Sequence, residues 1–373
     1  MKNIKFSIPS ISNKDINLVG KILRSGWLTH GKYVSFFENE IKKFTNCKYA
    51  VSVSSCTAAL HLSCIASNFK NGDEIIVPAM THTATAHAVE FTGAKAVFAD
   101  VEPLSGNISL EEIKKKISNK TKGVIIVHMA GYPCEIEEIY NFCKKKKIIL
   151  IEDCAHALGT YFKGMHAGNY GISGNFSFYP TKQITTGEGG MIITNNKRFY
   201  EKVKKLKAFG IDKDINERKK QGHYDVKLLG FNYRMTDFQA ALGYRQLISY
   251  KKNLRRRHEI AKRYIKNFSK IVTIKYNPYS IDSSFFVFQI FCKNRDKLLK
   301  KLKKYNIGVS VHYATPLPKM TYYKKKYRLK MKNYKNSDIY GKTNISLPIY
   351  PKLKNKQIDI ISRAIINLNE NKK

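Results

Sequence analysis

Alternation between short apolar runs and helical stretches restricts the fold of this chain more than any other feature. Seven apolar runs predict strands, at 49–54, 74–78, 96–101, 123–129, 148–153, 174–179 and 190–195. Helical patterns separate most of them, and several runs are apolar at consecutive positions, as strands buried on both faces are. The sequence therefore predicts an α/β fold with a mostly parallel seven-stranded sheet covered by helices.

The second half of the chain has a different texture. Residues 234–268 predict one or two long helices, and short strands and charged helices follow. A chain of 373 residues is long enough for two domains. We expect a large domain over residues 1–250 and a smaller C-terminal α/β domain over residues 251–373.

Composition and charge exclude several classes of protein. The formal net charge is +39, but the lysines are spread over the chain, so we expect attraction of small anionic substrates rather than nucleic-acid binding. Apolar runs fall short of the roughly 18 to 20 residues that span a bilayer, and the N-terminus lacks the apolar stretch of a signal peptide. We expect a cytoplasmic protein without a membrane partner. The seven cysteines are scattered without a CxxC motif, which predicts reduced thiols and no metal site.

A segment rich in hydroxyl groups, Ser-Ser-Cys-Thr-Ala-Ala-Leu, follows the first predicted strand and opens a helix. Ser54, Ser55 and Thr57 supply hydroxyls, and backbone N–H groups in the first turn of a helix have no partner within it. Such a segment can hold a phosphate group. The alternative is that Ser55 or Thr57 only caps the helix.

Three more polar side chains follow buried strands, where ligands of parallel sheets bind. Asp153 ends the strand at 148–153, and a buried acid there is costly unless it is paired. It forms either a structural salt bridge or the anionic partner of a protonated ring nitrogen. His156 lies three residues further on and is either structural or part of the same site. His82 follows the second strand and either stacks on a flat ligand or begins a helix that Thr81 caps.

Lys182 lies between a Pro-Thr turn and a run of Thr and Gly, an unusual setting for a solvated lysine. The small residues predict a tight backbone passage with room for a ligand. A lysine enclosed in this way loses solvation, so its pKa falls and its neutral amine becomes a nucleophile. A phosphate cup, a buried acid, a flat ring and an enclosed lysine together predict a pyridoxal phosphate site.

The chain resembles the sugar aminotransferases of the DegT/DnrJ/EryC1/StrS family, which have the aspartate-aminotransferase (type I) fold. The resemblance extends over nearly the whole chain. It is carried by "SGWLTHGKYVSFFENEIKKF", "GDEIIVPAMTHTATAHAV", "IEDCAHALG", "SFYPTKQITTGEGGMIIT", "GFNYRMTDFQAALGYRQL" and "SLPIYPKL".

The resemblance implies roles around the cofactor ring. Lys182 would form the Schiff base with pyridoxal 5'-phosphate and later move the proton between the carbons of cofactor and substrate. Asp153 would pair with the pyridinium nitrogen and keep it protonated. His156 would lie near the phenolic oxygen, and His82 would stack on the ring face.

The resemblance also implies contacts to the phosphate and the substrate. Thr57, the backbone N–H of Ala58 and the Ser177 hydroxyl would hold the phosphate, and Asn232 would reach it from the second subunit of a homodimer with shared sites. His312, Tyr313 and Thr29 would contact the sugar nucleotide.

The sequence departs from the family pattern at two positions of the site. Cys56 stands where relatives usually have Gly, so the turn of the phosphate cup is expected to differ slightly. His82 stands where Phe, Tyr or Trp is frequent, and an imidazole is a smaller stacking surface.

The implied reaction moves the amine of L-glutamate to the cofactor and then to a nucleotide-linked keto-sugar, a 4-keto-6-deoxyhexose by family preference. The product would serve a lipopolysaccharide, a capsule or another glycoconjugate. Two alternatives share the fold. Dehydratases of this kind replace the Schiff-base lysine with His, and a non-catalytic regulator would be expected to have lost Lys182 or Asp153; this chain keeps both.

Overall fold

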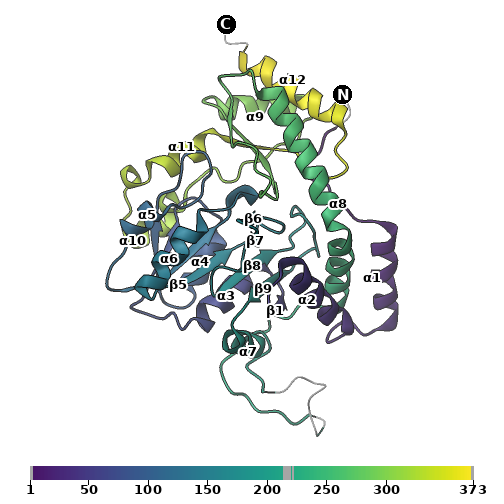
Figure 1. Ribbon diagram of the computed structural model, residues 1–373, viewed down its shortest axis with the longest axis vertical. Coiled ribbons are helices and arrows are strands. Elements are labelled where there is room, and N and C mark those ends of the chain that lie inside the picture. Colours follow the sequence, from purple (N-terminus) through teal and green to yellow (C-terminus); the bar gives the residue numbers. More distant parts are fainter. Residues whose placement is uncertain (1–2, 213–219, 221, 371–373) are drawn as a thin grey trace.

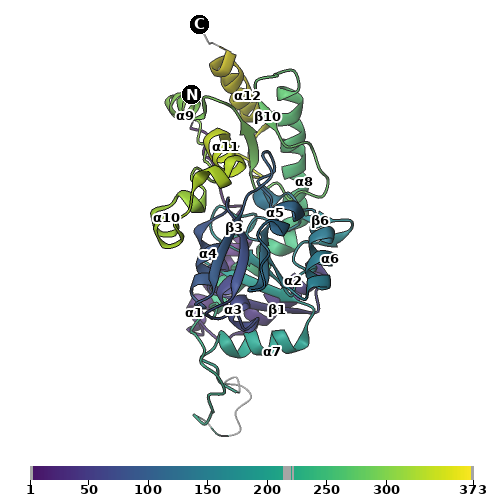
Figure 2. The same cartoon turned by 90° about the vertical axis from the view of Figure 1, so that its left-hand side faces the viewer.

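The computed structural model describes residues 3–212, 220 and 222–370. Along its longest axis, one end of the molecule holds a large sheet with its helices, and the other holds a small sheet with α9 and α12 (Figure 1). A quarter turn about this axis shows that α10 stands out from the side of the molecule (Figure 2).

The large sheet contains seven strands, as the apolar runs predict. In chain order they are β1 (Tyr49–Val53), β2 (Glu74–Pro78), β3 (Lys95–Ala99), β4 (Thr121–Val127), β5 (Ile149–Asp153), β8 (Ser173–Ser177) and β9 (Gly190–Thr194). Their spatial order is β1-β9-β8-β5-β4-β2-β3. Strands β3, β2, β4, β5 and β8 pair in parallel, whereas β9 runs antiparallel to both of its neighbours. The predicted α/β class with a mostly parallel sheet is confirmed.

Helices cover this sheet and begin where polar residues cap them. The helices of the first two thirds of the chain are α1 (Asn13–Ser25), α2 (Lys32–Thr45), α3 (Cys56–Ala66), α4 (Thr83–Glu90), α5 (Leu110–Lys114), α6 (Ile136–Lys146), α7 (Lys197–Leu206) and α8 (Asp237–Phe268). Ser12, Ser55, Ser109 and Asn196 each accept a backbone hydrogen bond at a helix start, as N-cap residues do. A short hairpin of β6 (Tyr161–Phe162) and β7 (Met165–His166) follows β5.

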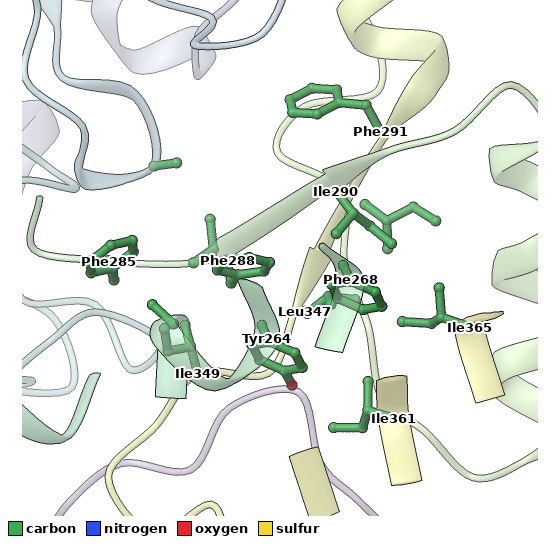
Figure 3. Close-up of a cluster of buried hydrophobic side chains, with 14 of the residues drawn as sticks. Tyr264, Phe268, Phe285, Phe288, Ile290, Phe291, Leu347, Ile349, Ile361 and Ile365 are labelled. Carbon is green, nitrogen blue, oxygen red and sulfur yellow. The ribbon is translucent and has the colours of Figure 1, made fainter. Parts of the chain in front are cut away.

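The small sheet has the antiparallel order β10-β11-β12. Its strands are β10 (Lys275–Tyr276), β11 (Phe288–Phe291) and β12 (Asn344–Leu347), and the helices around it are α9 (Arg295–Lys304), α10 (Thr321–Tyr327), α11 (Lys335–Thr343) and α12 (Asn355–Glu370). Side chains from α8, β11, β12 and α12 form one buried apolar cluster (Figure 3). This cluster gives the C-terminal part of the chain its own core.

Helix α8 is continuous over 32 residues and belongs to both cores. Tyr250, in the first half of the helix, is buried against the large-sheet core, whereas Tyr264 and Phe268 are buried in the cluster of the small sheet. The expected domain boundary near residue 250 therefore falls inside this helix. The N-terminal Ile4 also joins the small-sheet core and forms a bridge with Ile307, so the division at residue 250 stays a prediction.

The structure also bears on the expectations for the cysteines and for membrane-spanning segments. The seven cysteines are buried, and none of them forms a disulfide with another described residue. Within the described residues, no helix combines the length and the apolar character needed to cross a membrane.

Candidate active site

A cavity of about 440 Å³ opens at the carboxyl ends of the parallel strands. Segments that follow β1, β2, β5 and β8 form its walls, together with residues 312–313 of the C-terminal part. The predicted site residues that line it are Thr57, His82, Asp153, Ser177, Lys182, His312 and Tyr313. The topology explains this convergence, because carboxyl ends of neighbouring parallel strands meet at one edge of the sheet.

Lys182 lies in the turn after β8, where its backbone N–H donates to the carbonyl of Tyr179 at 2.9 Å. Its side chain is half-buried and points into the cavity. Burial lowers the pKa of the ammonium to about 8, while the negative charge of Asp153 acts in the opposite direction. Near neutral pH, a useful share of this amine is therefore unprotonated and nucleophilic.

Asp153 ends β5 at the centre of the sheet and is only 3% exposed. Burial raises the pKa of its carboxyl group, and hydrogen bonds to the charged form oppose that rise. The Thr85 hydroxyl donates to Oδ2 at 2.8 Å, and the Ala155 backbone N–H donates to Oδ1 at 3.0 Å. Asp153 forms no salt bridge with another described residue, so the structural alternative considered for it is not what the structure shows.

At the start of α3, the hydroxyl-rich segment caps the helix and also lines the cavity, so both alternatives considered for it apply. Ser55 caps the helix, and its Oγ accepts the Ala58 backbone N–H at 3.1 Å. The Ala58 N–H expected to hold a phosphate is thus engaged within the chain. Cys56 and Thr57 line the cavity, and their N–H groups, which have no partner within the helix, could still bind an anion.

Gly189 and Gly190, which follow Lys182, are explained by close contacts within the chain rather than by the room for a ligand that we expected. A Cβ on Gly190 would lie 2.5 Å from the Ser55 carbonyl and 2.7 Å from the Cys56 nitrogen. A Cβ on Gly189 would lie 2.2 Å from the Thr186 hydroxyl. Gly190 allows β9 to pass against the start of α3, and Gly189 makes room for the Thr186 side chain, so the space at these two glycines is filled by the chain itself.

His82 begins α4 as its N-cap, and its Nδ1 accepts the Ala84 backbone N–H at 3.2 Å. His82, rather than Thr81, therefore caps the helix, and its ring still lines the cavity. Burial lowers the pKa of the imidazole. The ring lies 5.8 Å from that of Tyr313, across the cavity mouth.

His156 is buried beside the cavity, and its tautomer follows from its partners. The Ala130 backbone N–H donates to Nδ1 at 3.3 Å, so the neutral ring carries its proton on Nε2. Nε2 lies 3.3 Å from the Tyr313 hydroxyl. Burial holds the pKa of His156 well below its usual range and raises that of Tyr313, so both stay neutral at physiological pH. The phenol accepts from His156 and keeps its own proton for a ligand.

His312 comes from the C-terminal part of the chain. Its Nδ1 lies 2.9 Å from the Ser346 hydroxyl, and burial lowers its pKa to about 3. This imidazole is therefore neutral in the cavity wall.

Besides Ala58 and His156, the predicted residues Asn232 and Thr29 do not line the cavity of this single chain. Asn232 is exposed, and its backbone forms a bridge with Ala208. Thr29 is exposed in the turn before α2. The contact predicted between Asn232 and the phosphate involves a second subunit and stays a prediction. The contact predicted between Thr29 and the sugar nucleotide also stays a prediction.

Thr85 and Phe286 contact predicted site residues and escaped the sequence reasoning. Thr85 holds Asp153, and its only signal was its place in the first turn of the helix that His82 begins. Phe286 lies beneath the Lys182 ammonium, with 4.2 Å between Nζ and the ring centroid, and the same ring stacks on His156 at 4.2 Å. Phe286 is far away in the sequence and had no local signal.

Glu152 precedes Asp153 on β5, and its fully buried carboxylate is enclosed by donors. Oε1 accepts the backbone N–H groups of Tyr170 at 2.8 Å and Gly171 at 2.7 Å, and Oε2 accepts that of Gly168 at 2.7 Å. Gly168 has a φ of 97°, a conformation that favours glycine. The loop after the β6–β7 hairpin is thereby fixed to the strand that carries Asp153.

His128 supplies the fourth donor to Glu152. Its Nδ1 accepts the Cys134 backbone N–H at 3.1 Å, so Nε2 carries the proton and donates to Oε2 at 3.0 Å. Potential ligand atoms of His128, Glu152 and Cys154 lie within 4.8 Å of one another. His128 and Glu152 already bind partners within the chain, so we interpret this group as structural.

Comparison with known proteins gives matches over nearly the whole chain. A model described as the DegT/DnrJ/EryC1/StrS aminotransferase family matches residues 9–366. GDP-perosamine synthase of Escherichia coli O157:H7 is 34% identical, with 98% of each chain covered. UDP-4-amino-4,6-dideoxy-N-acetyl-beta-L-altrosamine transaminase of Campylobacter jejuni is also 34% identical, again with 98% of each chain covered.

A solved structure agrees with these matches. Spr1654 from Streptococcus pneumoniae, described as a candidate sugar aminotransferase and solved in its PLP form, superposes with a TM-score of 0.92. It is 30% identical, with 99% of each chain covered. The comparisons confirm the resemblance, the type I fold, the aminotransferase class and pyridoxal phosphate as cofactor, all predicted from the sequence.

Proposed function

Because the chain belongs to the DegT/DnrJ/EryC1/StrS aminotransferase family, we propose that it transfers the amine of L-glutamate to a nucleotide-linked keto-sugar. One observation carries the proposal. A lysine whose pKa is lowered to about 8 shares one cavity with a buried aspartate at the carboxyl ends of the strands. These are the nucleophile and the anion that a pyridine-ring cofactor requires.

The residues present fit pyridoxal phosphate. The cofactor supplies a ring that takes up electrons from the carbon that gains or loses the amine. Asp153 would hold a proton on the ring nitrogen, and Thr85 fixes the orientation of its carboxylate. Lys182 would bind the cofactor aldehyde and, once free, move the proton. Ser177, Thr57 and the first turn of α3 would bind the phosphate.

The acceptor is proposed to be a 4-keto-6-deoxyhexose on a nucleoside diphosphate. Two relatives support this choice by name, a GDP-perosamine synthase and a transaminase that forms a UDP-linked 4-amino-4,6-dideoxy sugar. A net charge of +39 suits a diphosphate-bearing substrate. A relative described as a spore coat polysaccharide biosynthesis protein supports a product destined for a surface polysaccharide or another glycoconjugate.

The active unit is proposed to be a homodimer with shared sites. Asn232 is exposed and does not line the cavity of its own chain. A second copy would bring this amide to the phosphate end of the neighbouring cavity, as the family resemblance implies.

Absorption spectroscopy tests the two half-reactions separately. The protein is loaded with pyridoxal phosphate, converted with L-glutamate, freed of glutamate and offered keto-sugars on dTDP, GDP and UDP in turn. We expect glutamate to replace the spectrum of the pyridoxal form with that of the pyridoxamine form. We expect one keto-sugar to reverse the change and so identify the nucleotide.

A matched pair of variants controls this assay. Lys182→Ala should abolish both spectral changes, whereas Lys197→Ala, an exposed lysine at the start of α7, should leave them intact. Failure of the glutamate step in the wild-type protein would contradict the proposed donor. Full activity of Lys182→Ala would contradict the assignment of the site.

A further inference from the structure

The Lys182 ammonium is in contact with an aromatic ring rather than in a salt bridge. Within the described residues, its ammonium forms no salt bridge and no side-chain hydrogen bond. Its Nζ lies 4.2 Å from the centroid of the Phe286 ring, within the range at which a cation is attracted to an aromatic face. The aromatic ring is therefore a direct contact of this ammonium.

The position of Phe286 is fixed from several sides. Its side chain is 3% exposed and belongs to the small-sheet core that Figure 3 shows around Phe285 and Phe288. Its ring stacks on His156, with centroids 4.2 Å apart and 18° between the planes. A ring held by a core on one side and by His156 on another is a rigid surface.

Side chains of residues near Phe286 and Lys182 are also hydrogen-bonded to one another. Gln183 follows Lys182, and its Nε2 donates to the Ser284 hydroxyl at 2.9 Å and to the His156 carbonyl at 2.6 Å. The Ser284 hydroxyl also donates to that carbonyl at 3.0 Å. The distance between the Lys182 stem and the Phe286 ring is thus set by buried hydrogen bonds.

We propose that Phe286 is a positioning residue that holds the free ammonium of Lys182 over its ring whenever the cofactor is not joined to it. This inference rests on the proposed function, in which Lys182 is released and rejoined in every cycle. A lysine stem has many rotamers, so a released amine would otherwise leave the place where it must accept and return a proton. The aromatic face holds the Lys182 ammonium in place more weakly than a salt bridge would, so that the amine can be released again.

The aromatic face also acts on the charge state of Lys182. Burial lowers the pKa of this ammonium to about 8. An aromatic quadrupole favours the charged form, so it limits that fall. Replacing the ring by an aliphatic side chain should therefore lower the pKa further and increase the neutral share at a given pH roughly three- to tenfold.

The first test uses cofactor-free protein and does not depend on the reaction. Trace acetylation at a series of pH values, read by mass spectrometry on the peptide that carries Lys182, gives the pKa of this one lysine. We expect Phe286→Leu to lower that pKa relative to wild type and Phe286→Tyr, which keeps an aromatic face, to preserve it. Phe286→Met is the second aliphatic variant, because its flexible side chain fills irregular space if Leu does not fold.

The second test uses the loaded enzyme. Phe286→Leu should lower kcat about tenfold while KM for the keto-sugar changes little, and Phe286→Tyr should restore kcat. An unchanged pKa of Lys182 in the aliphatic variants would overturn the inference, even if the enzyme proved to be an aminotransferase. If the wild-type enzyme showed no aminotransferase activity, the proposed function would be contradicted, but the comparison of the Lys182 pKa values would still stand.

Discussion

Replacement of Glu152 by glutamine should destabilise the fold strongly, although the two side chains have almost the same shape. The carboxylate accepts four hydrogen bonds, two on each oxygen. A glutamine offers one oxygen and one NH2 group, so two of the four donors must face an NH2 group in either orientation. In one orientation these are the N–H groups of Tyr170 and Gly171.

The other orientation offers no relief. There the NH2 group faces Gly168 and the protonated Nε2 of His128. A change of tautomer would free Nε2 but would place a proton on Nδ1, which faces the Cys134 N–H at 3.1 Å. Each buried donor left without an acceptor costs about 1–3 kcal/mol, so we expect the free energy of unfolding to fall by about 2–6 kcal/mol. This is a large part of the ~5–15 kcal/mol that stabilises a typical domain.

Urea unfolding of the cofactor-free protein, followed by circular dichroism, measures this loss. Glu201→Gln on α7 is the matched control, because Glu201 is exposed and lies 4.0 Å from Lys197 on the helix surface; it should leave the midpoint unchanged. A loss of less than about 1 kcal/mol for Glu152→Gln would refute the reasoning, because it would mean that water or a rearranged loop satisfies the donors.

Three further predictions concern the active site. Thr85→Val removes the hydroxyl that donates to Asp153 at 2.8 Å, so the pKa of Asp153 should rise further; a hydrogen bond to a charged group is worth about 1.5 kcal/mol or more, and fluorescence titration should show roughly tenfold weaker binding of pyridoxal phosphate. Wild-type affinity would mean that Thr85 is dispensable. Asn232→Ala should weaken cofactor retention during dialysis if a partner chain supplies this amide, and unchanged retention would count against the shared site. The lowered pKa of Lys182 means that the unfolded chain binds more protons than the folded one between about pH 8 and the ordinary lysine pKa of about 10.4. Stability of the cofactor-free protein, compared with Lys182→Met, should therefore rise with pH across this window in denaturant titrations, and parallel pH profiles would contradict the assignment.

The sequence predicted the sheet and its ends well because the signals there are local. Apolar runs such as that of β4 and β5 report burial directly, and Lys182 and Asp153 stood out because their neighbours made a solvated role implausible. Thr57 and His82 had weaker local signals, and Ser177, His312 and Tyr313 were expected only from the resemblance; the structure places all five in the lining of one cavity.

The rest depended on contacts between distant segments. Phe286 and Lys182 are more than a hundred residues apart, and no spacing rule links them. Glu152 is enclosed by backbone N–H groups of a loop. Almost every residue type has such a group, so the sequence carries no signal for this contact. The glycines after Lys182 did attract notice, but the sequence could not say whether a ligand or the Ser55–Cys56 backbone lay against them.

Helix α8 has a consequence for how the protein unfolds. A helix of 32 residues forms a rod of about 48 Å, since each residue adds about 1.5 Å. Tyr250 in the first half of the helix is buried in the core of the large sheet, and Tyr264 and Phe268 in the second half are buried in the other core. Loss of either core would leave half of this helix without its packing, and the bridge from Ile4 to Ile307 joins the N-terminus to the C-terminal part as well. The two parts should therefore melt in one cooperative transition, and the walls of the active site should be lost together with both cores.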